Sequence, residues 1–233
     1  TLVIPEVNPQ DIDLYKHKNI IANPNCSTIQ MLVALKPLHD TFCVKHINVC
    51  TYQAVSGSGK DGVEELLQQS SAYIDQRSID KKVYPKQIAF NSIPFVDCFL
   101  ENNYTREEMK MVWETHKILD ENISVNPTAV RVPVLVGHAE SIYIETEKEI
   151  DIELAKNCLN EFAGISVIDD VQEVDFPTSF EHGHGTDDVY VGRIRKGLSK
   201  NNSLNLWVVA DNVRKGAALN SIQIAENLVG SEM

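Results

Sequence analysis

Asn23-Pro24-Asn25-Cys26-Ser27-Thr28 links a short apolar run, Ile20–Ala22, to a long segment in which apolar residues recur with the period of a helix. The pattern predicts a buried strand, a sharp turn and then a helix that carries Cys26 in its first turn. Asn25 and Ser27 are residue types that cap the start of a helix, which supports the position of the turn. Cys26 is thus expected at the N-terminus of a helix.

A cysteine at this position has chemical consequences. The first N–H groups of a helix lack internal partners, and the N-terminus carries roughly half a positive charge. Both features lower the pKa of a nearby thiol, and the same N–H groups can hold an oxyanion after the sulfur attacks a carbonyl. Cys26 is therefore a candidate nucleophile. The alternative is that it is a small buried hydrophobic residue after a capped turn.

The composition argues against some classes of partner. The formal net charge of −12 disfavours a nucleic acid held by phosphate neutralisation. No apolar run approaches the roughly 20 residues of a membrane-spanning helix, so no membrane partner is expected. The five cysteines form no CxxC pair, which indicates a reduced, cytoplasmic protein. The cysteines expected to be buried and unreactive are Cys43, Cys50, Cys98 and Cys158.

Periodicity and turn residues predict a succession of strands and helices. The predicted strands cover residues 2–4, 19–22, 44–53, 123–135, 140–146, 165–168, 188–195 and 204–210. The first predicted helix follows Cys26 and is interrupted near its end by Pro37, and the others cover residues 60–75, 105–119, 150–162 and 216–229. Thr105 and Glu108 have the spacing of a capping box. The helix at 60–75 follows a flexible loop at 56–59 and is expected to turn inward Val63, Leu66 and Leu67. This order of elements predicts an α+β domain built on a mixed sheet with long helices.

Six stretches of the chain resemble aspartate-β-semialdehyde dehydrogenases. The stretches are Asn23–Thr28 (NPNCST), Thr51–Gly59 (TYQAVSGSG), Tyr104–Leu119 (YTREEMKMVWETHKIL), Arg131–His138 (RVPVLVGH), Val191–Arg195 (VGRIR) and Asp211–Glu226 (DNVRKGAALNSIQIAE). They extend from residue 23 almost to the C-terminus. Several independent motifs in order are a far more specific signal than any single motif.

The resemblance implies a division of the chain. Residues 1–24 would be a remnant of a nucleotide-binding Rossmann domain, because the chain opens without an initiating Met and contains no GxGxxG-like loop. Residues 25–213 would form the catalytic and dimerisation domain, which resembles the C-terminal domain of glyceraldehyde-3-phosphate dehydrogenase. Residues 214–233 would form a helix that returns to the nucleotide-binding domain. We expect a homodimer or a tetramer, and we expect the 233-residue chain alone to be inactive and not to bind NADPH.

The resemblance also implies a reaction, the NADPH-dependent reductive dephosphorylation of L-aspartyl-4-phosphate to L-aspartate 4-semialdehyde and phosphate through a cysteine thioester. Cys26 would be the nucleophile and His138 its acid/base partner, able to take the thiol proton. A lone histidine between two strands is otherwise more often structural. Arg131 would bind the substrate α-carboxylate, since guanidinium and carboxylate form two parallel hydrogen bonds. Its alternative is a surface arginine, although it lies within an apolar strand.

The remaining roles follow from the same resemblance. Gln53 would orient the substrate through its amide, or else cap the following glycine loop. Glu107 would bind the substrate amino group and Lys110 the phosphate, whereas on their own they are an i,i+3 ion pair on a helix. Asn25 would also contact the substrate. The residues expected to contact NADP are Ser56, Gly57 and Asn212.

Three other interpretations remain open. His182 and His184, separated by one glycine, resemble a metal motif but have no matched third ligand, so no metal is expected. N-acetyl-glutamyl-phosphate reductase shares the chemistry, but we associate it with a different sequence around its cysteine. A cysteine–histidine hydrolase would need no nucleotide.

Overall fold

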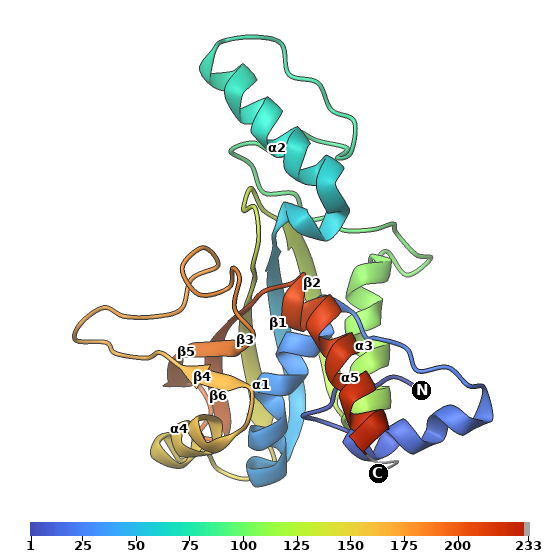
Figure 1. Ribbon diagram of the computed structural model, residues 1–233. Coiled ribbons are helices and arrows are strands. Elements are labelled where there is room, and N and C mark those ends of the chain that lie inside the picture. Colours follow the sequence, from blue (N-terminus) through green and yellow to red (C-terminus); the bar gives the residue numbers. More distant parts are fainter. Residues whose placement is uncertain (231–233) are drawn as a thin grey trace.

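A mixed sheet forms the centre of the computed structural model, which describes residues 1–230 (Figure 1). In the described part of the chain the strands are β1 (Val44–Gln53), β2 (Ser124–Arg131), β3 (His138–Thr146), β4 (Ile165–Val167), β5 (Val189–Lys196) and β6 (Ser203–Ala210). They lie side by side in the order β2-β1-β3-β6-β5-β4. The β1/β2 and β4/β5 pairs are parallel and the other neighbours are antiparallel. The predicted α+β class is confirmed.

The helices come between the strands. They are the short η1 (Pro9–His17), α1 (Cys26–Phe42), η2 (Val55–Ser58), α2 (Gly59–Ile74), α3 (Arg106–Ile118), α4 (Ile152–Glu161), the π-helical η3 (Arg214–Ala218) and α5 (Leu219–Gly230). The predicted capping box is present at the start of α3, where Thr105 and Glu108 bond reciprocally. Asp151 caps α4 by accepting a hydrogen bond from Leu154 N.

Helix α1 is the centre of the core. It contacts β1, β3, β5 and β6 on one face of the sheet and lies between α3 and α4. Burying one of its large apolar side chains stabilises the fold by about 1.5–3 kcal/mol. On the opposite face of the sheet, alternate side chains of β1, β3 and β6 are only half-buried or exposed. The sheet therefore has one covered and one partly open face.

Some local predictions were wrong. Residues 2–4 and 19–22 form no strands and share only a bridge between Leu2 and Ala22, because each pairs over too short a length. Pro37 does not interrupt α1, which continues to Phe42 with Pro37 buried inside it. Leu67 is exposed rather than inward-facing. Two short helices, η1 and η2, lie where a polar connection and a flexible loop were expected.

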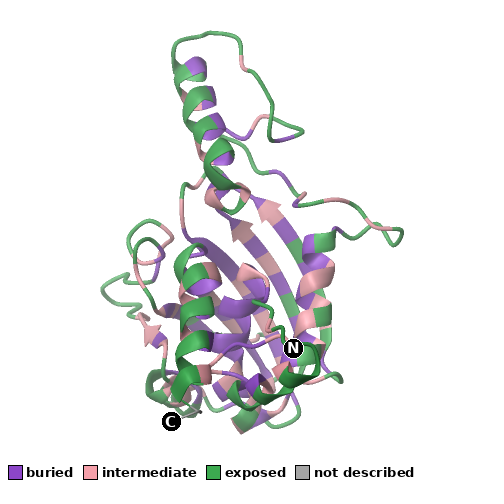
Figure 2. Ribbon diagram, turned by 45° about the vertical axis from the view of Figure 1, so that its right-hand side comes forward, coloured by how far each residue is buried: buried purple, intermediate pink, exposed green. Residues whose placement is uncertain are grey.

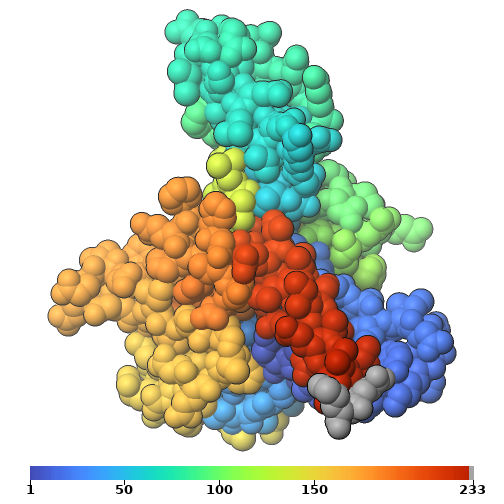
Figure 3. Space-filling view, viewed as in Figure 1, coloured from blue at the N-terminus to red at the C-terminus, as the bar shows by residue number. Residues whose placement is uncertain are grey.

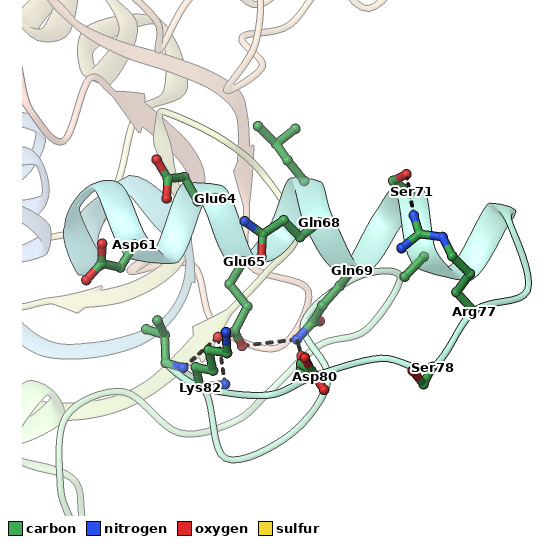
Figure 4. Close-up of a pocket in the computed structure, with 13 residues that line it drawn as sticks. Asp61, Glu64, Glu65, Gln68, Gln69, Ser71, Arg77, Ser78, Asp80 and Lys82 are labelled. Carbon is green, nitrogen blue, oxygen red and sulfur yellow. Dashed lines mark hydrogen bonds between the residues drawn. The ribbon is translucent and has the colours of Figure 1, made fainter.

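Helix α2 and the segment that follows it form an arm that projects from the body of the molecule (Figures 1 and 3). Much of the outer surface of α2 is exposed (Figure 2). A small apolar core of its own holds the base of the arm, and polar contacts close the hollow beneath α2 (Figure 4). There the Glu65 carboxylate accepts hydrogen bonds from Lys82 N at 2.8 Å and Val83 N at 2.6 Å. These hydrogen bonds hold the segment after α2 against the helix and so stabilise the arm.

Helix α5 lies against the N-terminal segment on the outside of the body (Figure 3). Val3 and Ile12 form a small core with Ile224 of α5. The outer side of α5 is exposed at Ile222, Ala225 and Val229, and Ala218 at the end of η3 is exposed as well. The division into segments 1–24, 25–213 and 214–233 stays a prediction, and residues 231–233 of the last segment lie outside the described residues.

Candidate active site

The turn before α1 is built by Asn25, as the sequence predicts. Its side-chain oxygen accepts hydrogen bonds from Ser27 N at 3.0 Å and Thr28 N at 3.4 Å, so Asn25 is the N-cap and Cys26 is the first residue of the helix. The other half of the amide, Nδ2, donates to Glu107 Oε1 at 2.9 Å. One residue therefore ties the start of α1 to α3.

Glu107 is the centre of a buried polar cluster. Its Oε1 also accepts a hydrogen bond from Gln53 Nε2 at 3.0 Å, and its Oε2 accepts one from Lys110 Nζ at 3.2 Å. The Glu107–Lys110 ion pair is thus present, but Glu107 is buried and faces Asn25 and Gln53 rather than solvent. Burial opposes the charge on Lys110, yet Glu107 and Asp97 outweigh it and raise the pKa of the ammonium.

Gln53 is the last residue of β1, and its side chain points into this cluster. Its Nε2 donates to Ser27 Oγ at 2.5 Å as well as to Glu107. Its Oε1 is buried and has no hydrogen-bond partner among residues 1–230. Gln53 therefore does not cap the following loop through its side chain, and it presents an acceptor that a ligand N–H could satisfy.

Arg131 and His138 meet at the backbone of Ala54. Arg131 Nη1 donates to Ala54 O at 2.6 Å, and Ala54 N donates to His138 Nδ1 at 3.0 Å. Gly57 closes the group, since a Cβ atom there would lie 3.0 Å from Arg131 Nη1 and 3.4 Å from His138 Nε2. Both side chains are buried, so Arg131 is not a surface arginine.

His138 is held in one protonation state. Burial, and then the positive charge of Arg131, place the pKa of the imidazole well below its usual value, so the ring is neutral at pH 7. Because Nδ1 accepts the Ala54 N–H, the single ring proton resides on Nε2. The ring is thus arranged as a hydrogen-bond donor at Nε2. In this state it has no free nitrogen to take the thiol proton, the role that the sequence led us to expect of His138.

The thiol of Cys26 does not behave as its helix position predicts. Burial, and then the negative charge of Glu107, raise its pKa to about 12. The Ser27 N–H and the Arg131 charge act in the opposite direction but do not compensate. The prediction of a lowered pKa was wrong because it counted the helix N-terminus and not the desolvation and the carboxylate, which only the fold brings to the sulfur.

The three residues expected to contact a nucleotide also lie at this end of the sheet. Ser56 and Asn212 bond to each other, with Asn212 Nδ2 donating to Ser56 Oγ at 2.9 Å. Asn212 Oδ1 accepts a hydrogen bond from Gly137 N at 2.9 Å, which fixes the turn before His138. Gly216 of η3 packs on the first residue of α1, since a Cβ there would lie 2.8 Å from Cys26 Cβ.

Other candidates lie apart from this cluster. His182 accepts a hydrogen bond from Thr178 N through Nδ1 and stacks against Tyr190, and no group of three or more potential metal ligands occurs within residues 1–230. The expectation that the remaining cysteines are buried was wrong, because all are half-buried free thiols: Cys43, Cys50, Cys98 and Cys158.

The sequence interpretation missed residues that support the site. Glu114 of α3 accepts a hydrogen bond from Asn25 N at 2.9 Å, and burial raises the pKa of its carboxyl. Gln30 and Glu140 are fully buried below Cys26 and His138. Their positions carry a signal, since Gln30 follows Cys26 by one helical turn and Glu140 shares a strand face with His138.

Comparison with known proteins identifies the family of the chain. Residues 35–215 match the family model described as the semialdehyde dehydrogenase dimerisation domain. The aspartate-semialdehyde dehydrogenase of Shewanella violacea is 58% identical over 229 residues, which cover 98% of this chain and 67% of that protein. The chain belongs to the aspartate-semialdehyde dehydrogenase family. It is thus related to oxidoreductases and spans about two thirds of the length of this relative.

Other members of the family confirm the relationship. The aspartate-semialdehyde dehydrogenase of Aquifex aeolicus is 53% identical over 98% of this chain and 67% of its own length. A crystal structure of aspartate-semialdehyde dehydrogenase II from Vibrio cholerae, complexed with ASA, superposes with a TM-score of 0.97 at 52% identity. The match covers 100% of this chain and 68% of the Vibrio cholerae chain. A structure of the Candida albicans enzyme with NADP has a TM-score of 0.71 at 26% identity, covering 97% of this chain and 66% of that one.

Proposed function

We propose that this chain, within an enzyme of the length of its relatives, catalyses the reaction of the family, the NADPH-dependent conversion of L-aspartyl-4-phosphate to L-aspartate 4-semialdehyde and phosphate, and that the 233 residues alone do not. The product is a precursor for lysine, threonine, methionine and diaminopimelate biosynthesis. The observation that carries the proposal is that a buried guanidinium, Arg131, and a buried carboxylate, Glu107, both lie near enough to the Cys26 thiol for their charges to act on it. An amino acid with both an α-carboxylate and an α-ammonium matches this pair of charges.

The substrate would bind through complementary charges. Arg131 is oriented by Ala54 O and can offer its remaining N–H groups to the α-carboxylate. Glu107 can pair with the α-ammonium, and the free Oε1 of Gln53 can accept one of its protons. Lys110, which is half-buried at the edge of the cluster, is the cation placed to contact the phosphate, and Asn25 holds Glu107 in position.

Substrate binding would also activate the thiol. Glu107 raises the pKa of Cys26, so an ammonium paired with Glu107 removes part of that effect and lowers the pKa. The sulfur then attacks the acyl carbon and the C–O bond to phosphate breaks. Phosphate leaves with the electron pair and takes up the proton that the thiol loses, which produces a thioester on Cys26. His138, with its proton on Nε2, is arranged to donate to the substrate oxygen as negative charge develops there.

NADP is expected beside this cluster, and the residues present fit a nicotinamide. Gly57 lacks a side chain next to Arg131 and His138, and Ser56 and Asn212 offer a hydroxyl and an amide from the same rim. NADPH, when bound, supplies the hydride that reduces the thioester. The Cys26 sulfur then leaves with its electron pair and can repeat the cycle.

One experiment tests the reaction and its substrate class together. The parent enzyme that carries this chain is assayed for phosphate-dependent NADP reduction with L-aspartate 4-semialdehyde, and in parallel with N-acetyl-glutamate semialdehyde, and the 233-residue chain alone is assayed as the inactive reference. We expect activity with the first substrate only, since an N-acetyl group removes the ammonium that the buried Glu107 would pair. A mass adduct is expected on Cys26, and an adduct on another cysteine or preference for the acetylated substrate would contradict the proposal.

Arg131→Lys separates charge from geometry in the same assay. Lysine retains the charge but not the two-pronged hydrogen bonding, so we expect kcat/KM to fall about 10²–10³-fold, as for a lost charged hydrogen bond of about 3–4 kcal/mol. The matched control is Arg195→Lys on the exposed end of β5, which is expected to leave kcat/KM unchanged. Loss of the circular dichroism signal in Arg131→Lys would instead indicate a structural role.

The homodimer belongs to the same proposal. The open face of the sheet carries the half-buried Tyr52 and Trp207, whose rings lie 5.4 Å apart, and a second copy would cover them. Light scattering is expected to report twice the chain mass, and Trp207→Glu to reduce it to the monomer mass.

Five free thiols are consistent with a cytoplasmic location. No described helix is long and apolar enough to span a membrane.

A further inference from the structure

Gln30 and Glu140 form a second layer directly below Cys26 and His138. Gln30 follows Cys26 by four residues on α1, a rise of about 6 Å along the same helix face. Glu140 follows His138 by two residues on β3, a rise of about 6.6 Å on the same strand face. The two rises are nearly equal, so Gln30 and Glu140 lie at the same level, one layer beneath Cys26 and His138. Any contact between the lower pair determines how α1 and β3 are spaced at the upper pair.

The lower pair does make contact. Gln30 Nε2 donates to the His138 backbone oxygen at 3.5 Å, and the Gln30 side chain is also the hydrogen-bonding neighbour of the Glu140 carboxyl. Thr51 of β1 lies directly opposite Glu140 in the β1/β3 register. Gln30, Glu140 and Thr51 each have 0% exposure, so bulk water does not reach them.

The hydrogen bonding of this group is incomplete if Glu140 is ionised. Both Glu140 carboxylate oxygens, Gln30 Oε1 and Thr51 Oγ1 lack a well-aligned hydrogen-bond partner within the described chain. A carboxylate can only accept, whereas a carboxylic acid adds one O–H donor. A proton on Glu140 can be donated to Gln30 Oε1, and the Thr51 hydroxyl can donate to the remaining Glu140 oxygen. Burial acts in the same direction and dominates: it raises the pKa of Glu140 well above its usual value, although the hydrogen bond from Gln30 lowers it.

We propose that Glu140 is a neutral acid that clasps Gln30, and that this clasp sets the position of Cys26 relative to His138. Gln30 and Glu140 are then positioning residues, which act through the helix and strand that carry the reacting groups. The proposal rests on the proposed function only in taking Cys26 and His138 as the reacting pair.

A conservative and a disruptive variant of Glu140 test the clasp. Glu140→Gln retains the shape and one donor, so we expect kcat within about twofold of the parent protein. Glu140→Leu leaves Gln30 without its partner, and a misplacement of about 1 Å can cost about 10²-fold in rate, so we expect kcat to fall about 10–100-fold. KM should change less than twofold, since Arg131 and Glu107 are not touched. Equal losses of kcat in both variants would overturn the proposal.

The apolar double variant Gln30→Leu/Glu140→Leu keeps the test decisive if Glu140→Leu folds poorly. Replacing both partners removes both unpaired polar groups, so the double variant should melt at a higher temperature than either single variant. Its kcat should be no lower than that of the worse single variant, because the two residues act as a unit. Independent, multiplicative losses of kcat would contradict the clasp.

Alkylation of Cys26 tests the charge of Glu140 without any turnover. The charged groups that act on the thiol are Glu107 on α3, Arg131 on β2 and, if ionised, Glu140 on β3, beside the neutral His138. If Glu140 is neutral, Glu140→Gln leaves the pH dependence of iodoacetamide alkylation at Cys26 unchanged. If Glu140 is ionised, its replacement speeds alkylation severalfold at pH 8, which would overturn the proposal.

The other four free thiols serve as internal references for access and folding in this alkylation test. Failure of the proposed reaction would show as absent turnover in the parent protein, while the alkylation comparison would still decide the state of Glu140.

Discussion

Helix α1 begins at Cys26, and η3, which leads into α5, packs against the same residue, yet the surroundings of α1 and α5 are opposite. Helix α1 is covered along most of its length by the sheet, α3, α4 and η3, and Ile29 within it has 0% exposure. Helix α5 contacts η1 on one side, and on its outer side Ile222 is 55% exposed. Similar apolar periodicity predicts both helices. The difference teaches that periodicity identifies a helix with an apolar side, but does not tell whether this chain supplies the partner.

The largest expected effect is on turnover, and it comes from Cys26, where the start of α1 meets η3. Cys26→Ala removes the sulfur that α1 carries, and turnover should fall at least about 10⁴-fold, as for other enzymes that lose their nucleophile. Binding of L-aspartate 4-semialdehyde, measured by calorimetry, should persist within a fewfold because Arg131 and Glu107 remain. Substantial residual turnover would show that Cys26 is not the nucleophile.

Gly216→Ala should have a smaller but marked effect from the α5 side. Its Cβ would meet Cys26 Cβ at 2.8 Å, so the thiol or η3 must shift. We expect kcat to fall about 10–100-fold with KM within threefold, because the misplacement affects the sulfur rather than the charged groups. Gly230→Ala at the end of α5, where an added Cβ would meet no other part of the described chain within 4 Å, is the matched control and should be neutral.

Replacing one isoleucine on each helix by alanine compares how much burial in α1 and in α5 contributes to stability. Ile29→Ala should lower the free energy of unfolding by about 2–5 kcal/mol, since it leaves a cavity in the core. Ile222→Ala should change it by less than about 0.5 kcal/mol, since the side chain is already half in water. Urea denaturation of both variants measures the contrast. A large loss for Ile222→Ala would mean that another copy of the chain covers α5.

The smallest predicted effect concerns the charge that α3 brings to the start of α1. Glu107→Gln removes a carboxylate that raises the pKa of Cys26, so the pKa falls and more thiolate is present at a given pH. We expect alkylation at pH 8 to be about tenfold faster, which corresponds to a fall of about one pKa unit. The control is Glu101→Gln on an exposed loop, which should leave the rate unchanged. Slower alkylation in Glu107→Gln would reverse the sign of the argument.

Local signals in the sequence were sufficient for much of the fold. The alternation in residues 44–53 predicted β1 with its observed ends, and the Thr105/Glu108 spacing predicted the start of α3. The failures were of two kinds. Residues 2–4 and 19–22 have strand composition but no long strand to pair with. Pro37 was predicted to interrupt α1, but the buried helix continues through it. Pairing and packing at a distance decided these cases.

The same division holds for the site. By itself the sequence determined the residue types and their order, including the cap by Asn25, the cysteine that follows it, and the motifs that carry Gln53, Glu107, Arg131 and His138. Only the tertiary structure decided the protonation of these groups. A pKa depends on desolvation and on charges that are close in space but distant in sequence, and Glu107 is 81 residues from Cys26 along the chain. The buried carboxylate therefore outweighs the helix N-terminus at the thiol, and the Ala54 N–H assigns the proton of His138.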